Sequence, residues 1–83
     1  IGVLSSLRAL SLRGCQLTIL PDTIQQLTAL IHLDLRANHL ERLPEAVLSL
    51  PSLEKLDLRW NANLSIPAAW IQQLEDRDCL VYV

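Results

Sequence analysis

The chain has 83 residues, 51% of them hydrophobic, and a formal net charge of −2 from seven basic and nine acidic residues. A chain of this length forms one domain, and no apolar run approaches the roughly 20 residues that span a membrane. The slightly acidic balance argues against nucleic acid, which favours a basic protein face. We therefore expect neither a membrane nor a nucleic acid among the partners.

The sequence repeats itself with an offset of 23 residues. Leucines and prolines recur in fixed columns: Leu10, Leu33 and Leu56; Leu12, Leu35 and Leu58; Pro21, Pro44 and Pro67. A period of this size is typical of a solenoid, in which each repeat buries its apolar face only by stacking on its neighbours. We divide the single domain, residues 1–83, into three coils at 7–29, 30–52 and 53–75, followed by a terminal strand at 79–83.

The Leu-x-Leu segment of each coil predicts a short parallel strand. We expect strands near residues 8–13, 31–36, 54–59 and 79–83. Because side chains alternate across a strand, the leucines point into the core and the residues between them point outward. In the last strand, Cys79 and Val81 take the inward positions, so Leu80 and Tyr82 face outward.

The proline of each coil is expected to begin the return path on the opposite, convex side, because proline is tolerated at the start of a helix. Residues 45–50 predict a single turn or a 3-10 segment. Residues 68–76 predict a longer α-helix with Trp70, Ile71 and Leu74 on its buried stripe. We expect this helix to close the C-terminal end of the solenoid, and Trp70 to belong to the core.

The clearest copy of the repeat reads L-x-x-L-x-L-x-x-N-x-L-x-x-L-P and begins at Leu30. This pattern resembles the leucine-rich repeat family, and the 23-residue spacing with Leu-Pro resembles its intracellular and bacterial subclass, which includes Ras-pathway scaffolds. The resemblance covers essentially the whole chain. It implies an α/β solenoid with short parallel strands on the concave face, short helical or 3-10 turns on the convex face and a C-terminal helical cap.

Polar residues in the turns favour a structural role. Asn38 and Asn61 occupy one column, where a buried amide can satisfy backbone groups of its own turn and of the neighbouring turn. Cys15 stands in that column in the first coil. It lies three strand spacings, about 14 Å, from Cys79, whereas a disulfide needs Cα atoms within about 7 Å. We therefore expect reduced cysteines and a cytoplasmic location, with secretion or delivery as a bacterial effector left open.

The outward-facing strand residues are the candidate partner-binding site. An arginine column (Arg13, Arg36, Arg59) runs beside an aspartate column (Asp34, Asp57). These residues can be read as a solvated charge ladder or as a strip that binds a partner, and we give the two readings equal weight. The candidate set is Arg13, His32, Asp34, Arg36, Lys55, Asp57, Arg59, Trp60, Leu80 and Tyr82. We expect Trp60 to be at least partly exposed, either as a packing lid or as a binding hot spot.

No chemistry of its own is expected from the chain. His32 and His39 should not converge on a metal, and no nucleophile has a recognisable base, so we expect no catalytic residue, metal or cofactor. The hypothesis is a non-catalytic protein–protein interaction module that binds a protein partner through the concave face. The alternative is the substrate-recognition region of a larger enzyme or signalling protein, such as an effector ubiquitin ligase or a kinase.

The first strand carries an expectation about assembly. Nothing polar in the sequence caps the apolar residues Val3, Leu4 and Leu7, and terminal repeats normally need a polar cap. We expect the chain to be a fragment that lacks upstream repeats or a cap. We also expect edge-to-edge self-association through the uncapped strand, because unpaired edges template pairing with another chain.

Overall fold

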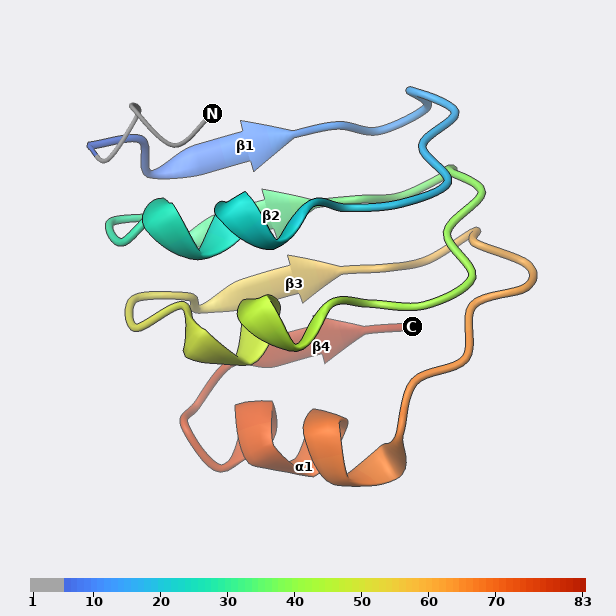
Figure 1. Ribbon diagram of the computed structural model, residues 1–83. Helices are drawn as coiled ribbons and strands as arrows, with labels where there is room; N and C mark the ends of the chain where they lie inside the picture. The colour runs from blue at the N-terminus through green and yellow to red at the C-terminus, as the bar shows by residue number, and fades with distance from the viewer. Residues whose placement is uncertain (1–5) are drawn as a thin grey trace.

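Four short strands form one parallel sheet in the computed structural model, which describes residues 6–83 (Figure 1). The strands are β1 (Ala9–Ser11), β2 (His32–Asp34), β3 (Lys55–Asp57) and β4 (Leu80–Tyr82), in that order across the sheet. Leu10 pairs with Leu33, Leu33 with Leu56, and Leu56 with Val81. The predicted α/β leucine-rich-repeat solenoid is therefore confirmed.

Short helical segments occupy the opposite side of the coils (Figure 1). These are the 3-10 helices η1 (Asp22–Gln26) and η2 (Glu45–Ser49) and the α-helix α1 (Ala68–Glu75), all close to the predicted positions. Each is preceded by the repeated proline at the position that caps the helix, with extended backbone at Pro21 and Pro44. The proline carbonyl accepts the first hydrogen bond of the segment, for example from the Val47 N–H at 3.1 Å.

The strands are shorter than predicted, because a tight turn follows each of the first three. Backbone pairing continues a few residues past the strand, where Gly14 N–H donates to the Arg36 carbonyl at 3.0 Å. The chain then leaves the strand direction at Gly14, Ala37 and Trp60, which share one column and have φ values of +69°, +57° and +67°. This left-handed backbone ends each strand.

The core is the stack of repeated leucines between the sheet and the convex segments. Leu30, Leu33 and Leu35 are at most 1% exposed, because each has a coil on both sides. Their first-coil equivalents Leu10 and Leu12 point inward as predicted but are only half-buried. Within residues 6–83 they have one neighbouring coil. The expectations on Val3 and Leu4 lie outside the described residues.

The last coil is covered on its convex side by α1, which packs against η2 and β4. Leu74 is buried, as predicted. Trp70 and Ile71 are only half-buried, and Trp70 packs against the buried leucines from the edge of the core rather than within it. Its indole lies on the final coil, where no further described coil covers it. Cys79 is buried and Val81 half-buried, so both point inward as predicted. The predicted register is wrong by two residues, because Val81 rather than Cys79 pairs with Leu56. None of the helices formed by residues 6–83 is long and apolar enough to cross a membrane.

Candidate functional site

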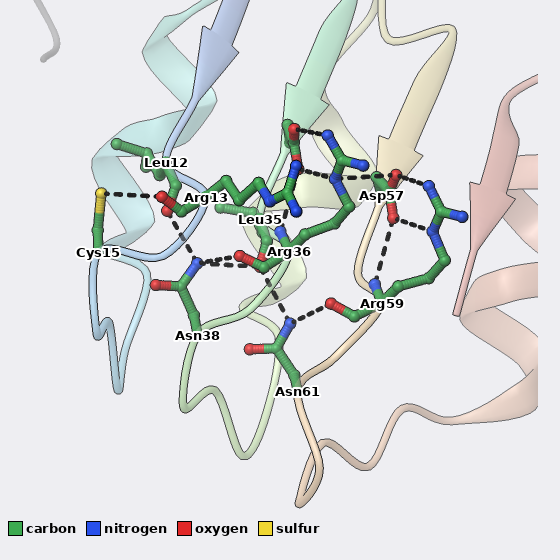
Figure 2. Close-up of polar contacts among 10 residues, drawn as sticks. Leu12, Arg13, Cys15, Leu35, Arg36, Asn38, Asp57, Arg59 and Asn61 are labelled. Carbon is green, nitrogen blue, oxygen red and sulfur yellow. Dashed lines mark hydrogen bonds and ion pairs between the residues drawn. The ribbon is translucent and has the colours of Figure 1, made fainter.

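Two asparagines fix the turns that follow the strands (Figure 2). The Asn38 amide donates to the carbonyls of Leu12 at 2.9 Å and Leu35 at 3.0 Å, while its oxygen accepts the Leu17 N–H at 2.9 Å. Asn61 repeats the arrangement one coil later. Each amide thereby joins its own coil to the preceding one, which confirms the structural role predicted for this column. In the first coil, Cys15 is exposed and makes only a 3.8 Å contact to the Arg13 carbonyl.

Each of the two aspartates on the concave face accepts two hydrogen bonds from the side chain of the arginine two residues later. Asp34 accepts from Arg36 Nε at 2.9 Å and Nη2 at 2.7 Å, and Asp57 accepts from Arg59 Nε and Nη2 at the same distances. The backbone N–H of each arginine donates to the same carboxylate. Bidentate pairs of this kind hold the guanidinium in a fixed orientation.

The aspartate–arginine pairs are more buried than a solvated ladder would be. Asp57 is only 3% exposed, because Arg59 covers it and Arg36 of the preceding coil lies 3.4 Å away. Hydrogen bonds from the arginines hold the pKa of Asp34 and that of Asp57 below the ordinary value of 3.8, although burial opposes this. Both carboxylates are therefore charged at neutral pH. The interpretation of the pairs as fully solvated is wrong at Asp57.

The first coil breaks the pattern of pairs. Ser11 lies in register with Asp34, so Arg13 has no aspartate two residues before it. Arg13 is exposed, and within residues 6–83 its guanidinium forms no ion pair and donates no hydrogen bond to a side chain. Among the described residues, Arg13 is thus the arginine of the column whose guanidinium has no carboxylate within ion-pair distance. Its charge still helps to lower the pKa of Asp34 in the next coil.

Trp60 lies over the arginine column. The centroid of its indole is 5.1 Å from the Cζ of Arg13, 5.8 Å from that of Arg36 and 5.6 Å from that of Arg59. Cations within about 6 Å of an aromatic centroid are attracted by the ring, which offsets the repulsion that stacked arginines would otherwise feel. The side chain is 59% exposed, as predicted. The ring reaches back from the third coil to Arg13 of the first coil.

Tyr82 forms a second aromatic contact at the C-terminal end of the strip. Its ring centroid is 5.4 Å from Lys55 Nζ and 5.3 Å from Arg59 Cζ. Leu80 beside it is 60% exposed. Over β2 and β3, a hollow of about 220 Å³ lies among residues of the second and third coils that include His32, Asp34 and Lys55. The structure thus places the predicted residues on one continuous face.

The charge of this face differs in sign from that of the chain. The concave strip carries a net charge of +2. Its four positive charges come from the three arginines of the column and Lys55, and its two negative charges come from Asp34 and Asp57. The whole chain carries −2, so the residues outside the strip are acidic. We use the name concave strip for the ten candidate residues on this face.

Groups suited to chemistry are dispersed. Cys79 is buried, and burial raises the pKa of its thiol, whereas Cys15 is exposed in a turn of the first coil. Among the described residues, no three His, Cys, Asp or Glu side chains come together in a way that could hold a metal ion. What the concave strip offers is hydrogen-bond donors, positive charge and aromatic surface.

The sequence indicates that Trp60 has a role beyond the turn, because its repeat column otherwise holds Gly14 and Ala37. A small residue in two coils and a large aromatic residue in the third marks a side chain that the turn does not require. The direction in which the indole lies could not be inferred, because it depends on the left-handed backbone at Trp60.

Comparisons with known proteins give one consistent result. A family model described as leucine rich repeat matches residues 5–62. A solved structure of a leucine-rich repeat protein from Leptospira interrogans is similar over 82% of this chain, with a TM-score of 0.63 and 27% sequence identity. The matched part is 17% of that protein's length, so the present chain spans a small share of it. No curated protein sequence matches.

Proposed function

The chain belongs to the leucine-rich repeat family, whose repeats generally serve as protein-interaction modules, and from this premise we propose that it is a non-catalytic module that binds a protein partner through the concave strip. The observation that carries the proposal is the exposure of large side chains on a face built from short, rigid strands. Trp60 is 59% exposed, Leu80 60% and Tyr82 38%.

These residue types are the ones that dominate protein interfaces. Tryptophan, tyrosine and arginine are enriched among residues whose truncation weakens binding most. The concave strip holds two aromatic rings, each within 6 Å of at least two cationic groups. The amides of Asn38 and Asn61 hold the backbone of the turns, and the two aspartates hold the guanidinium groups of Arg36 and Arg59. A partner therefore loses little binding free energy to the ordering of this face.

The convex face offers less for a partner to bind. Its exposed residues in η1 and η2 are mainly small or polar, such as Asp22, Gln25, Glu45 and Ser49.

The alternative, that these repeats select the substrate of a larger enzyme or signalling protein, stays a prediction and would use the same concave strip. A cytoplasmic location also stays a prediction.

Self-association through the first strand stays part of the proposal. Within residues 6–83, β1 pairs with β2 on one side only, and Leu7, Leu10, Leu12 and Leu17 beside it are half-buried. A second copy that stacked on this side would cover the leucines and pair the open strand edge.

The proposal can be tested by crosslinking. A benzophenone amino acid at Leu80 should crosslink the partner, and the same group at Ser49, which is exposed on the convex side, should not. A matched pair of charge reversals, Lys55→Glu on the strip and Glu45→Lys on η2, should weaken binding only in the first case. Crosslinks from Ser49 alone, with binding lost only in Glu45→Lys, would place recognition on the convex face.

A further inference from the structure

We propose that Arg13 and Trp60 together form a carboxylate-binding site and that the partner segment recognised by the concave strip is an acidic peptide rich in Asp and Glu. This inference rests on the proposed function and specifies its partner. It depends on three features of the strip: a guanidinium that pairs with no carboxylate among residues 6–83, an exposed ring beside it, and a local charge opposite to that of the whole chain.

The first feature is the vacant pairing position in the first coil. In the second and third coils, a carboxylate two residues before the arginine accepts two hydrogen bonds from its fork, at 2.7 and 2.9 Å. In the first coil that position holds Ser11, which lies in register with Asp34. The structure itself thus shows twice which ligand a guanidinium of this column binds, namely a carboxylate in bidentate contact.

The second feature is the indole beside Arg13. A free arginine side chain loses considerable rotamer entropy when a ligand fixes it. Trp60 lies 5.1 Å from the Arg13 Cζ, the shortest of the three distances from its ring to an arginine. The stacked ring restricts the guanidinium before a ligand arrives and leaves its edge donors free. Part of the ordering cost is therefore met in the unbound protein.

The backbone at Trp60 supports a functional role for this ring. Its φ of +67° matches that of Gly14 at +69° in the first coil. Left-handed backbone is rare for bulky residues and costs free energy relative to glycine. The same left-handed turn is formed by Gly14 and Ala37 in the other coils, so the turn does not require a tryptophan, and a ring that is 59% exposed there is consistent with a role in binding.

The third feature is charge. The concave strip carries a net charge of +2 while the chain as a whole carries −2. An acidic segment is therefore attracted to the strip and repelled by the remaining surface, and this directs it to one face. Lys55 and Arg59 beside Tyr82 offer further positive charge at the far end, so an extended acidic peptide can cross several coils.

The probe for this site is a peptide that repeats Glu-Leu-Gly four times, with Gln-Leu-Gly and Lys-Leu-Gly peptides of equal length as controls. Binding is measured by calorimetry at low and moderate salt and by Trp60 fluorescence in a Trp70→Phe background. The acidic peptide should bind at least about tenfold more tightly than the neutral one, with an affinity that falls as salt rises. The basic peptide should not bind.

The decisive variant is Ser11→Asp, which gives Arg13 the carboxylate that the other two coils provide. It should weaken the acidic peptide roughly tenfold, about as much as Arg13→Ala does. Two controls isolate the cause. Ser11→Asn has the same shape without the charge, and Ala9→Asp adds the same charge to β1 farther from Arg13, so both should weaken binding much less.

The possible results separate this inference from the proposed function. Equal binding to the wild type and Ser11→Asp, preference for the neutral peptide, or no binding of the acidic peptide would each overturn the acidic-carboxylate site. If the Leu80 crosslink to a protein partner persists in those cases, recognition by the concave strip still stands. If the acidic peptide binds through Arg13 but the partner crosslinks only from Ser49, the proposed function fails instead.

Discussion

The Nε of Arg36 lies 3.4 Å from the Oδ2 of Asp57 in the next coil. The same oxygen accepts from Arg59 Nη2 at 2.7 Å, so one buried carboxylate is shared by arginines of two coils. Because Arg36 is also bound to Asp34 at 2.7 Å, the charges form a connected network across the second and third coils. The concave strip is therefore held by side chains as well as by the backbone of the sheet.

Stability should depend on pH through this network. The folded protein holds the pKa of Asp57 below 3.8, so in acid the unfolded chain takes up a proton before the folded one does. The stabilisation is complete well above pH 3.8 and is lost as the pH falls through the lower, folded-state pKa. Asp34 behaves in the same way. Asp57→Asn should flatten this acid limb, as measured by urea unfolding between about pH 2 and pH 6.

The control for that experiment is Glu45→Gln, which removes an exposed carboxylate on η2. It should leave the acid limb close to that of the wild type. Equal flattening in both variants would show that the aspartate network does not set the pH dependence.

Arg36→Glu should destabilise the fold as well as weaken binding. The Arg36 side chain is 24% exposed and is tied to both aspartates; the substitution would place three carboxylates together. We expect its melting temperature to fall by several degrees, whereas Lys55→Glu, on an exposed side chain, should melt close to the wild type. Thermal unfolding followed by circular dichroism compares the two. A fully stable Arg36→Glu variant would contradict the shared network.

The two leucines Leu12 and Leu35 occupy one column but differ in burial, so they make a matched pair. Leu35 is 0% exposed between two coils, and truncation to alanine should cost about 2–5 kcal/mol of unfolding free energy. Leu12 is half-buried, and the same truncation should cost less than half as much. Chemical denaturation measures both. Equal losses would mean that the first coil is covered as completely as the second in solution.

The repeat predicted what depends on the backbone. Because the leucine columns recur every 23 residues, they fixed the number of strands, their parallel order and the inward leucines, and the Asn38 column predicted the turn amides. What it missed depends on long side chains. Asp57 is buried because the side chains of Arg36 and Arg59 lie across it. Trp60 contacts Arg13, two coils away, because its own backbone is left-handed. Neither the burial of Asp57 nor the contact between Trp60 and Arg13 can be predicted from the spacing of the repeat.

Self-association can be tested at the open edge of β1. We expect the chain to sediment as a mixture whose average mass rises with concentration. Within residues 6–83, half-buried leucines lie there beside a strand edge that pairs with no other strand. Lysines at Ala9 and Ser11, both exposed on β1, should shift the chain toward the monomer, because charge on an edge strand opposes pairing. Sedimentation velocity over a wide concentration range gives the result. A strictly monomeric wild type would refute edge pairing.

Trp60→Gly should separate binding from folding. At φ of +67°, glycine avoids the roughly 1–2 kcal/mol that left-handed backbone costs other residues, and this gain offsets the loss of the ring's contacts with the arginines. We expect a melting temperature equal to or above that of the wild type, together with about tenfold weaker binding of the acidic peptide. Gly14→Ala measures the backbone effect alone, since a Cβ there meets no atom within 4 Å, and it should be destabilising. If Trp60→Gly melts well below the wild type, the indole is a lid that stabilises the last coils, and its strain has no functional meaning.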